Sequence, residues 1–526
     1  MKTKNKISAI VVATCLSLGS CNVDPELTSQ YPEEVAWSNE TNVQLYINGF
    51  YSLIAGYYNS DDCYADITKE NNPTTNINAF IFGNTPITPA SNPFDVWGNR
   101  HTWQINCCRF LAGLEEHRAN FSETFANQAE AQVRFFRAVA NFDLAKRYGA
   151  SFILYKELPD VGEREHVRCT PEECWDFITA DLKFAAEHLP VKGSEGVELG
   201  ELTSGAAWGM LARTMLYAER WKDASDAAAE VMKQGYELYS NYGQLFLNSR
   251  NVPVANDESI IEFGYQYQTL DYSFDYFNCP PSDGGYAEVS PTEDLVSAYE
   301  MADGREFSWD DPGMAANPYE GREPRFYASI LYNGCEWKGE TLYTYEGSQD
   351  GYALGGGTTS TGYYMRKLFD PTLPKGEMHA CDLTYYYMRY AEVLLIYAEA
   401  MAMQDKLTEA LGALNEVRDR VDLPPVDATT QTDFMRLLRH ERMVELAFEG
   451  HRFWDLRRWG LASTVLNGTH MTGVKPVKES DGSFTYELVD CDAGKTRVYL
   501  EKYDRFPVPI SEIQQNPACE QFDEWK

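Results

Sequence analysis

The sequence predicts a mostly α-helical protein in which a helical-repeat scaffold carries large, irregular, loop-rich insertions. The first observation behind this prediction is a pair of segments, 203–235 and 389–421, whose apolar residues recur at the same spacing. The second is the character of residues 59–99 and 258–382, which show few helical periods and are rich in Gly, Pro, Ser, Asp, Asn and aromatic residues. With 526 residues, 44% of them hydrophobic, the chain can bury a sizeable core.

The two similar segments each indicate a pair of antiparallel helices. Apolar or small residues follow Trp208 at offsets of 3, 4, 7, 16, 20 and 23, and the same offsets follow Leu394. This is the spacing of a tetratricopeptide repeat, in which small residues let two helices cross closely. Ala212 and Ala398 take that place here, so the scaffold is predicted to be tetratricopeptide-repeat-like.

The same period of about 3.6 residues predicts helices outside these pairs. They are expected over 38–58, 100–118, 124–148, 172–188 and 430–450. The helical scaffold then covers about 38–58, 100–235 and 389–460, with insertions at about 59–99 and 258–382. Loops this long in a compact protein are usually functional. We therefore expect the insertions to lie together on one face and to bind the ligand.

The N-terminus is typical of an exported protein. Three lysines precede an apolar stretch over 7–18, which is too short to cross a bilayer and predicts a signal peptide over 1–20. The run Leu-Gly-Ser-Cys that ends at Cys21 resembles a lipoprotein signal-peptidase site, with Cys21 as the lipidated residue. An ordinary secretory signal followed by an incidental cysteine is the alternative. The mature chain, 21–526, is predicted to be a single domain that is anchored to a membrane through lipid.

Charge and cysteine spacing limit the partners and cofactors. The chain has 79 acidic and 45 basic residues and a net charge of −34, which repels phosphate backbones, so no nucleic-acid partner is expected. No cysteines show paired CxxC spacing, and neither a metal site nor another cofactor is predicted. The pairs Asp61-Asp62 and Asp310-Asp311 offer oxygen ligands to calcium, but neither has the spacing of an EF-hand loop.

The sequence lacks the motifs of common catalytic sites. There is no HExxH or GxSxG run, and Gly494-Lys495-Thr496 lacks the leading glycine of a phosphate loop, since Val489 stands at that position. No catalytic residue is therefore predicted. A secreted glycoside hydrolase stays an alternative, because two carboxylates suffice for that reaction and the chain has 79 acidic residues.

A run of alternating charges lies near the C-terminus. Glu441, Glu445 and Glu449 repeat every four residues and predict one acidic helix stripe, which Gly450 can end in a left-handed conformation. Asp455 follows, with arginines at positions 452, 457 and 458. Carboxylates and guanidiniums at this density favour bidentate pairing. We interpret the run as a structural clamp, with a catalytic or anion-binding cluster as the alternative.

This run, Glu-Arg-Met-Val-Glu-Leu-Ala-Phe-Glu-Gly-His-Arg-Phe-Trp-Asp-Leu-Arg-Arg-Trp-Gly over 441–460, resembles the C-terminal signature of the SusD/RagB family. Stretches within 129–149, 389–400 and 506–517 agree with it, whereas residues 520–525 depart from the family's ending. The resemblance implies a non-catalytic lipoprotein of the outer membrane that faces the cell exterior. It also implies capture of an oligosaccharide and delivery to a TonB-dependent, SusC-like transporter. An oligopeptide ligand, as in RagB-like proteins, is the alternative.

The aromatic residues of the insertions are the best binding signal. An aromatic ring can meet the flat C–H face of a sugar while neighbouring polar groups bond its hydroxyls. Packing in the core is the alternative for each ring. Trp97 and Arg100 also fall where family members often place ligand contacts. The residues predicted to bind ligand are Tyr64, Trp97, Arg100, Tyr276, Trp309, Trp337 and Tyr343.

Overall fold

The structure is a computed structural model that describes residues 33–56, 61–160, 162–248, 256–266, 269–270, 272–376 and 381–526. The predicted signal peptide over 1–20 and the predicted lipidation residue Cys21 lie outside this range. Among the described residues, no helix combines the length and the apolar character that a membrane span needs.

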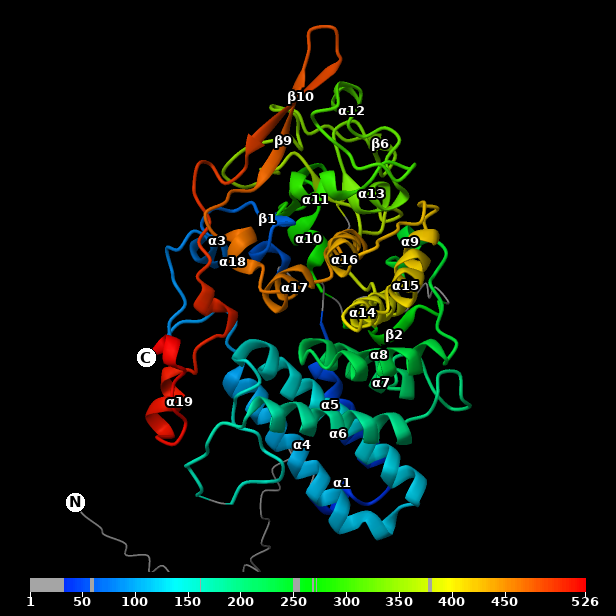
Figure 1. Cartoon of the computed structure of the whole chain (residues 1–526), viewed down its shortest axis with the longest axis vertical. Helices are drawn as coiled ribbons and strands as arrows, with labels where there is room; N and C mark the ends of the chain where they lie inside the picture. Colours follow the sequence, from blue (N-terminus) through cyan, green and yellow to red (C-terminus); the bar gives the residue numbers. More distant parts are fainter. Residues whose placement is uncertain are drawn as a thin grey trace, which may run out of the picture.

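An array of helices, each packed on the next in the chain, forms the lower part of the molecule in Figure 1. These helices are α4 (Trp97–His117), α5 (Glu123–Tyr148), α6 (Pro171–His188), α7 (Ser204–Tyr217) and α8 (Trp221–Met232). The array continues through α14 (Tyr390–Ala402), α15 (Leu407–Asp419) and α16 (Gln431–Glu445). Helix α8 packs on α14, which packs on both α15 and α16. The predicted mostly helical scaffold is confirmed.

The two predicted helix pairs are present as α7–α8 and α14–α15. The small residues at their crossings, Ala212 and Ala398, are fully buried. Their turns match as well, because Glu219 and Asp405 occupy the same place in the two repeats and have left-handed φ angles of 55° and 60°. The shared spacing therefore reflects shared geometry in the turns as well as in the helices.

The predicted helix over 430–450 is shorter than expected. Helix α16 ends at Glu445, and two turn residues, Phe448 and Gly450, have left-handed φ angles of 68° and 76°. Gly450 thus takes the predicted conformation, but the chain leaves the helix five residues earlier because Phe448 already has a non-helical φ. The chain then continues in α17 (Arg452–Arg458) and α18 (Ala462–Leu466).

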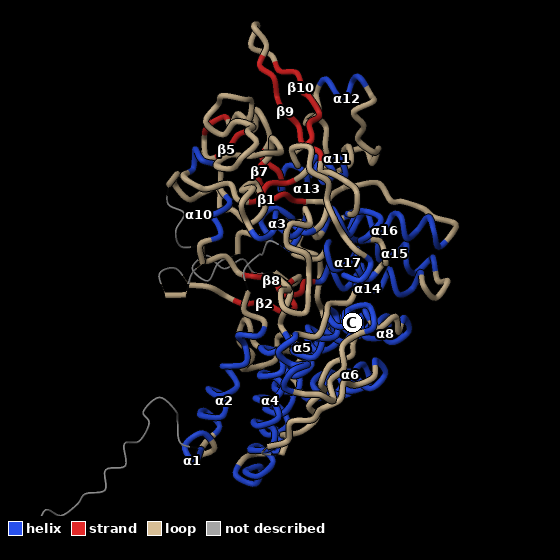
Figure 2. Tube along the Cα trace, turned by 90° about the vertical axis from the view of Figure 1, so that its left-hand side faces the viewer, coloured by secondary structure: helices blue, strands red, loops and turns tan. Residues whose placement is uncertain are grey.

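Shorter helices surround this scaffold. They are α1 (Glu33–Ala36), α2 (Glu40–Asn48), α3 (Asn76–Ile81), α9 (Tyr242–Leu245), α10 (Phe274–Asn278), α11 (Glu293–Ala298), α12 (Pro312–Ala316), α13 (Pro324–Ser329) and α19 (Ile510–Gln515). Short 3-10 turns lie at Gly49–Leu53, Asp61–Tyr64, Arg118–Asn120, Pro281–Asp283, Glu501–Asp504 and Asp523–Trp525. Most of the strands lie in the upper part of the molecule, away from the array α4–α8 (Figure 2).

The strands form five two-stranded antiparallel sheets among the described residues. They pair β1 (Thr68–Glu70) with β3 (Val289–Pro291), β2 (Ser259–Phe263) with β8 (Tyr385–Arg389), β4 (Ile330–Leu331) with β7 (Tyr364–Met365), β5 (Glu336–Trp337) with β6 (Glu340–Thr341), and β9 (Thr472–Lys478) with β10 (Phe484–Asp490). The β1–β3 pair joins the first insertion to the second, with Thr68 opposite Pro291 and Glu70 opposite Val289. The two insertions therefore lie together, as expected.

Two features at the C-terminal end were not predicted. The β9–β10 hairpin projects from the top of the molecule in Figure 1, and the last segment returns to the helical scaffold. There Phe506, Phe522 and Trp525 are buried in the same hydrophobic cluster as the helices. A second hydrophobic cluster fills the irregular part, so the insertions have a core of their own.

Candidate ligand-binding site

The charged run near the C-terminus forms a buried clamp. The carboxylate of Glu445 accepts hydrogen bonds from Arg325 (3.0 Å), Arg389 (2.6 Å) and Arg420 (2.5 Å). Glu441 pairs with Arg325 as well. Glu445 is fully buried, and these guanidiniums hold its pKa well below the usual range despite the opposing effect of burial. The pairing that was predicted as a clamp therefore joins α16 to three other segments.

The other carboxylates of the run are paired in the same way. Arg389 and Lys367 bond Glu449 at 2.7–2.8 Å, and Arg442 and Arg458 bond Asp455 at 2.8–3.1 Å. Their side chains are only 4% exposed. Such burial leaves little room for a substrate, so the structural interpretation explains the run better than a catalytic or anion-binding cluster does.

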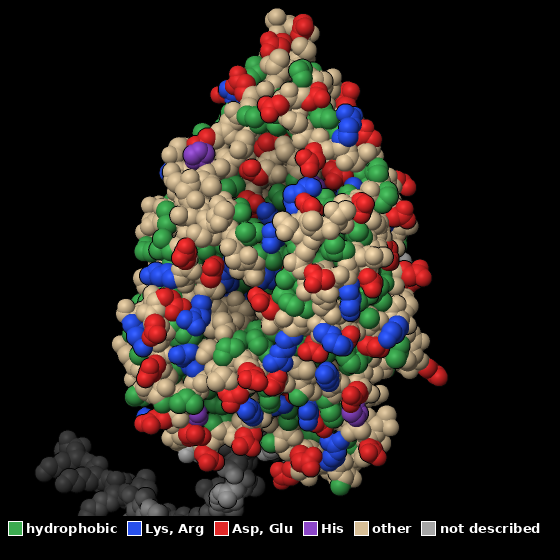
Figure 3. All heavy atoms as spheres, in the orientation of Figure 1, with side chains coloured by type: hydrophobic (Ala, Val, Ile, Leu, Met, Phe, Trp, Pro, Cys, Tyr) green, Lys and Arg blue, Asp and Glu red, His purple; other side chains and the backbone are tan. Residues whose placement is uncertain are grey.

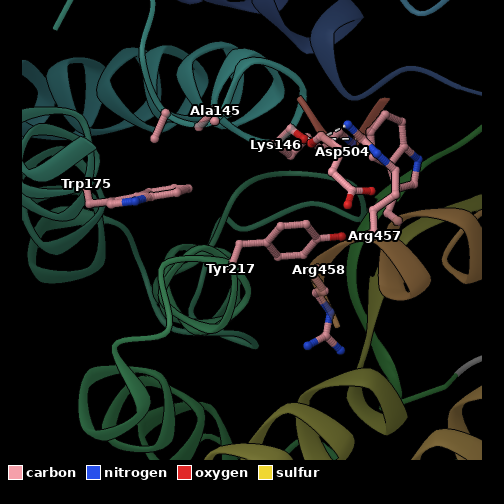
Figure 4. A pocket seen from close by; sticks show the side chains of 10 residues that line it. Ala145, Lys146, Trp175, Tyr217, Arg457, Arg458 and Asp504 are labelled. Atoms are coloured by element: carbon pink, nitrogen blue, oxygen red, sulfur yellow. Dashed lines mark hydrogen bonds between the residues drawn. The ribbon is translucent and has the colours of Figure 1, made fainter. Parts of the chain in front are cut away.

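Three cavities in the described part of the chain are considered as candidates for a binding site. The one in Figure 4 has a volume of about 240 Å³ and lies in the scaffold, with Trp175 and Tyr217 on one side and Lys146, Arg457 and Arg458 on the other. Its cations already have partners, since Arg458 bonds Glu399 and Asp455, Lys146 pairs with Asp143, and Arg457 bonds main-chain carbonyls. A second cavity, of about 580 Å³, lies beside α9 and is lined by Trp337 and Arg366.

The third cavity lies where the two insertions meet and has a volume of about 580 Å³. Alternation along strand β1 directs its side chains, because successive residues of a strand point to opposite faces. Thr68 and Glu70 line the cavity. Lys69 points to the other face, where its ammonium pairs with Asp492 at 3.0 Å. Phe277 and Asn278, the last two residues of α10, add an aromatic ring and an amide to the wall.

Three aromatic rings meet at the edge of this cavity, and we call Tyr276, Phe277 and Tyr286 the aromatic patch. The ring of Tyr276 lies 5.3 Å from that of Phe277 and 4.8 Å from that of Tyr286, and the two tyrosine hydroxyls are 2.9 Å apart. Phe277 is 42% and Tyr286 is 52% exposed. Main-chain hydrogen bonds from Tyr286 to Tyr276 and from Glu288 to Phe277, of 3.0 and 2.8 Å, hold the two segments side by side.

Carboxylates dominate the charged lining of the third cavity. Burial raises the pKa of Asp62 from 3.8 to about 7 and that of Glu70 from 4.5 to about 7. Burial also raises the pKa of Glu288, whose charge adds to the shift at Glu70. The described residues that line this cavity include no Lys, Arg or His. Over the face shown in Figure 3, by contrast, acidic and basic side chains are interspersed.

The structure places several predicted ligand contacts in the core. Trp97 is 3% exposed, and its indole N–H donates to Glu512 at 3.1 Å. Trp337 is 2% exposed and donates to Asp283 at 3.2 Å. Tyr64 is half-buried, with its ring 4.5 Å from the ring of Phe94. Burial favours the alternative of core packing for both Trp97 and Trp337, and Trp337 at the same time lines the second cavity.

The other predicted contacts are spread over separate places. Trp309 is half-buried and donates to Glu293 at 2.8 Å, and Arg100 bonds Asp143 at 2.8 Å. Tyr343 is 40% exposed and stacks on Phe484 of the hairpin, with ring centroids 5.8 Å apart. Only Tyr276 lies in the aromatic patch. The predicted residues therefore do not form one site.

The acidic pairs considered for calcium serve as hydrogen-bond acceptors. Asp61 accepts from the indole of Trp454 at 3.1 Å, and Asp62 accepts from the main-chain N–H of Gly450 at 3.1 Å. Asp311 caps α12 by accepting from two main-chain N–H groups. Within the described residues, no three His, Cys, Asp or Glu side chains are grouped so that they could hold a metal ion.

Sequence reasoning left out Phe277, Tyr286, Glu70 and Glu288. Phe277 stands directly after Tyr276 in an aromatic run, and the sequence does not distinguish which of the two rings is more exposed. Tyr286 carries a clearer signal, because it follows Gly284-Gly285. A Cβ at Gly285 would overlap the main chain of Cys279, which indicates a tight turn that returns Tyr286 to Tyr276.

Comparison with known proteins agrees with this fold. The profile of the SusD family matches residues 254–525, and a profile described as "Starch-binding associating with outer membrane" matches residues 23–216. A SusD-like protein of Bacteroides ovatus is 25% identical over 445 residues, which are 76% of this chain and 75% of that protein.

Two solved structures from Bacteroides fragilis are similar over nearly the whole chain. A SusD-like protein has a TM-score of 0.79 at 28% identity and covers 94% of this chain and 99% of its own. A SusD-like carbohydrate-binding protein also has a TM-score of 0.79, at 25% identity, and covers 92% of this chain and 100% of its own. Because the first family profile alone spans more than half of the 526 residues, the chain belongs to the SusD family, whose members are non-catalytic binding proteins.

Proposed function

We propose that this protein is a lipid-anchored, outward-facing glycan-binding protein of the outer membrane, which captures oligosaccharides and passes them to a TonB-dependent, SusC-like transporter. One observation carries the proposal: the aromatic patch is exposed at the edge of a cavity of about 580 Å³ between the two insertions. The similarity to a SusD-like carbohydrate-binding protein supports it. So does the family description that mentions the outer membrane.

The chemistry of the patch suits a sugar. The exposed rings of Phe277 and Tyr286 offer apolar faces to the C–H groups of a pyranose, and aromatic contacts of this kind contribute about 0.5–1.5 kcal/mol beyond the area they bury. Beside them, Asn278, Ser273 and Thr75 line the cavity and can bond hydroxyl groups. A few polar groups among apolar walls give orientation and specificity.

Anchoring of the protein would depend on the N-terminus, and delivery of the oligosaccharide would depend on contact with the transporter. Lipid at Cys21 would hold the folded part at the outer face of the membrane, and bacterial lipoproteins carry several acyl chains, which makes such anchoring stable. The rigid helical array would supply the broad surface that a lasting contact with a transporter needs. Replacing Cys21 by Ala should release the protein from the outer membrane, and co-purification with the transporter should persist only for the anchored form.

The binding test uses the soluble chain that starts after Cys21. Calorimetric titration with a panel of oligosaccharides should identify a ligand, and incubation with that ligand should release no new reducing ends. Tyr286→Ala should raise the Kd at least fivefold, which corresponds to about 1 kcal/mol, while Leu199→Ala, which removes a side chain that is 86% exposed elsewhere, should leave the Kd unchanged. An unchanged Kd in Tyr286→Ala would refute the assignment of the patch. Tyr343→Ala tests the second exposed aromatic group in the same way.

An oligopeptide ligand is the second candidate, and the carboxylates that line the cavity favour it when the peptide is basic. A peptide panel titrated in parallel separates the two ligand classes. Binding of peptides without binding of any glycan would overturn the proposal in favour of peptide capture.

A further inference from the structure

The carboxylates that line the cavity between the insertions have no cationic partner among the described residues. The buried carboxylates of the clamp, by contrast, have guanidinium partners, as Glu445 and Asp455 do. Asp62, Glu70 and Glu288 line the cavity together, and none of them forms an ion pair with any residue that the structure describes. Three acidic side chains thus border one space of about 580 Å³.

The neighbouring cations are already engaged. Lys69 lies between the cavity-facing residues of β1, but it points away and pairs with Asp492 at 3.0 Å. Arg452 bonds both oxygens of Asp66 at 2.7 and 2.8 Å. Lys367 bonds Glu449 at 2.7 Å. A rotation of any of these three side chains into the cavity would break an existing ion pair, so none of the three is free to neutralise the cavity.

Two buried acceptors of the cavity lack partners within the described part of the chain. Asp62 is 2% exposed and Asn278 is 7% exposed, and Oδ1 of each has no hydrogen-bond donor. A buried acceptor without a donor destabilises the folded protein. Both residues line the cavity. A bound group with several N–H donors and a positive charge would supply the missing hydrogen bonds and would also balance the charge of the carboxylates.

Building on the proposed function, we infer that the cavity between the insertions binds a primary ammonium group of the ligand, supplied by an amino sugar of the captured oligosaccharide. An ammonium has three donors and no acceptor, which matches a wall of carboxylate and amide oxygens. Each carboxylate at hydrogen-bond distance from it would contribute a charge-assisted bond. The ring that bears the ammonium would then rest against Phe277 at the edge of the cavity.

The acid–base behaviour of the cavity agrees with this geometry. The pKa of Asp62 is raised by burial and by Asp61 and Glu449, while main-chain N–H groups of residues 450 and 452 lower it. The pKa of Glu70 is raised by burial and by Glu288, and lowered by Lys69 and a main-chain N–H of residue 72. Carboxylates with a cationic partner in the unliganded protein would show the opposite shift.

The test compares three ligands at pH 7: a tetramer of glucosamine, the same tetramer with every amine acetylated, and a short lysine peptide. We expect the amine tetramer to bind at least tenfold more tightly than the acetylated one. Glu70→Gln and Glu288→Gln should each reduce this preference below threefold while leaving the affinity for the acetylated tetramer unchanged. Glu115→Gln, which removes the same charge from a side chain that is 79% exposed on α4, should preserve the preference.

The outcomes separate this inference from the proposed function. Binding of the acetylated tetramer without any preference for the amine would overturn the inference and leave glycan capture standing. A lysine peptide that binds in a manner dependent on Glu70, without binding of either tetramer, would keep the ammonium site but overturn the sugar as its source. Binding of the acetylated tetramer shows that each variant is folded. A variant that fails to fold would lose this binding too and would therefore not be mistaken for the expected result.

Discussion

Replacing Glu449 by Gln tests whether the buried clamp stabilises the fold. Two nitrogens of Arg389 bond the two carboxylate oxygens at 2.7 and 2.8 Å, and Lys367 adds a third bond at 2.7 Å. The side chain of Glu449 is 4% exposed. Gln keeps the shape but removes the charge, and its amide N–H₂ would face cations that need an acceptor. Lys367 would lose the only carboxylate with which it forms an ion pair among the described residues.

The expected loss can be worked out from the protonation of Glu449. Burial alone would raise the pKa of this carboxyl, but Arg389 and Lys367 lower it from 4.5 to about 2. That difference corresponds to about 3 kcal/mol of preference for the charged form in the folded protein. Breaking one partner of a buried pair costs about 3–5 kcal/mol in other proteins. We therefore expect Glu449→Gln to lower the free energy of unfolding at pH 7 by about 3 kcal/mol.

The pH dependence has a definite sign. A carboxyl whose pKa is lowered on folding stabilises the protein above its unfolded pKa of 4.5, and this stabilisation is lost as the pH falls toward the folded pKa of about 2. The gap between the wild type and Glu449→Gln should therefore be constant from pH 8 to pH 6 and should shrink to about 2 kcal/mol at pH 3.5.

Urea unfolding, followed by tryptophan fluorescence at several pH values, measures this gap. Glu340→Gln is the matched control, because it removes one carboxylate from a surface pair with Lys375 in which Glu340 is 70% exposed, and surface pairs contribute only about 0–1 kcal/mol. A loss below 1 kcal/mol in Glu449→Gln, or a gap that does not change between pH 7 and pH 3.5, would refute the reasoning.

Three further variants test other parts of the structure. Trp97→Ala should lower the free energy of unfolding by about 3–5 kcal/mol in urea, since the ring is 3% exposed and its N–H bonds Glu512; a loss below 1 kcal/mol would return Trp97 to the candidate ligand contacts. Gly113→Ala should lower the Tm, because a Cβ there would overlap the ring of Trp37, and overpacking of about 1–3 kcal/mol outweighs the better helix propensity of Ala. Burial raises the pKa of Glu70 from 4.5 to about 7, so stability that is present below pH 4.5 is lost as the pH rises through 7. Glu70→Gln should therefore become more stable than the wild type above pH 7, by up to about 3 kcal/mol, and a difference that does not vary with pH would contradict this.

The helical scaffold was predictable because its determinants are local. Ala212 and Ala398 mark the helix crossings, and each repeat closes within about thirty residues of chain. A match at one spacing can arise by chance, but two matches at the same offsets cannot easily do so, and the structure has the same left-handed turn at Glu219 and Asp405. The place of the insertions followed from the scaffold, since both leave and re-enter it between neighbouring helices.

The binding residues were not predictable, because exposure in the insertions depends on distant partners. Trp97 is held by Glu512, 415 residues away in the chain, and Trp337 by Asp283, 54 residues away. The residues next to each tryptophan in the sequence do not indicate either contact. An aromatic residue of a loop is therefore assigned to core or to surface only when the fold brings its partners together.

The β9–β10 hairpin escaped prediction for a different reason. Apolar and polar residues alternate along β10 from Phe484 to Leu488, but its partner β9 contains Gly473 and Pro476, and a proline within a run argues against a strand. Its turn does carry a signal, because Asp481 accepts from Ser483 at 2.9 Å and Gly482 has a left-handed φ of 89°. The turn and β10 were thus recognisable from the sequence, whereas β9 was not.

The segment from Glu445 to Gly450 belongs both to the clamp and to the cavity between the insertions. The charged run therefore helps to position residues that line this cavity. Glu445 and Glu449 are fixed by Arg389. Phe448, which lies between these two glutamates in the chain, lines the cavity, and Gly450, just before α17, donates to Asp62 at 3.1 Å. A non-glycine residue with the left-handed φ of Phe448 costs about 1–3 kcal/mol and persists only where its surroundings impose it. The ion pairs on either side supply that constraint, so the buried charges of the scaffold hold the floor of the cavity in place without contacting a ligand themselves.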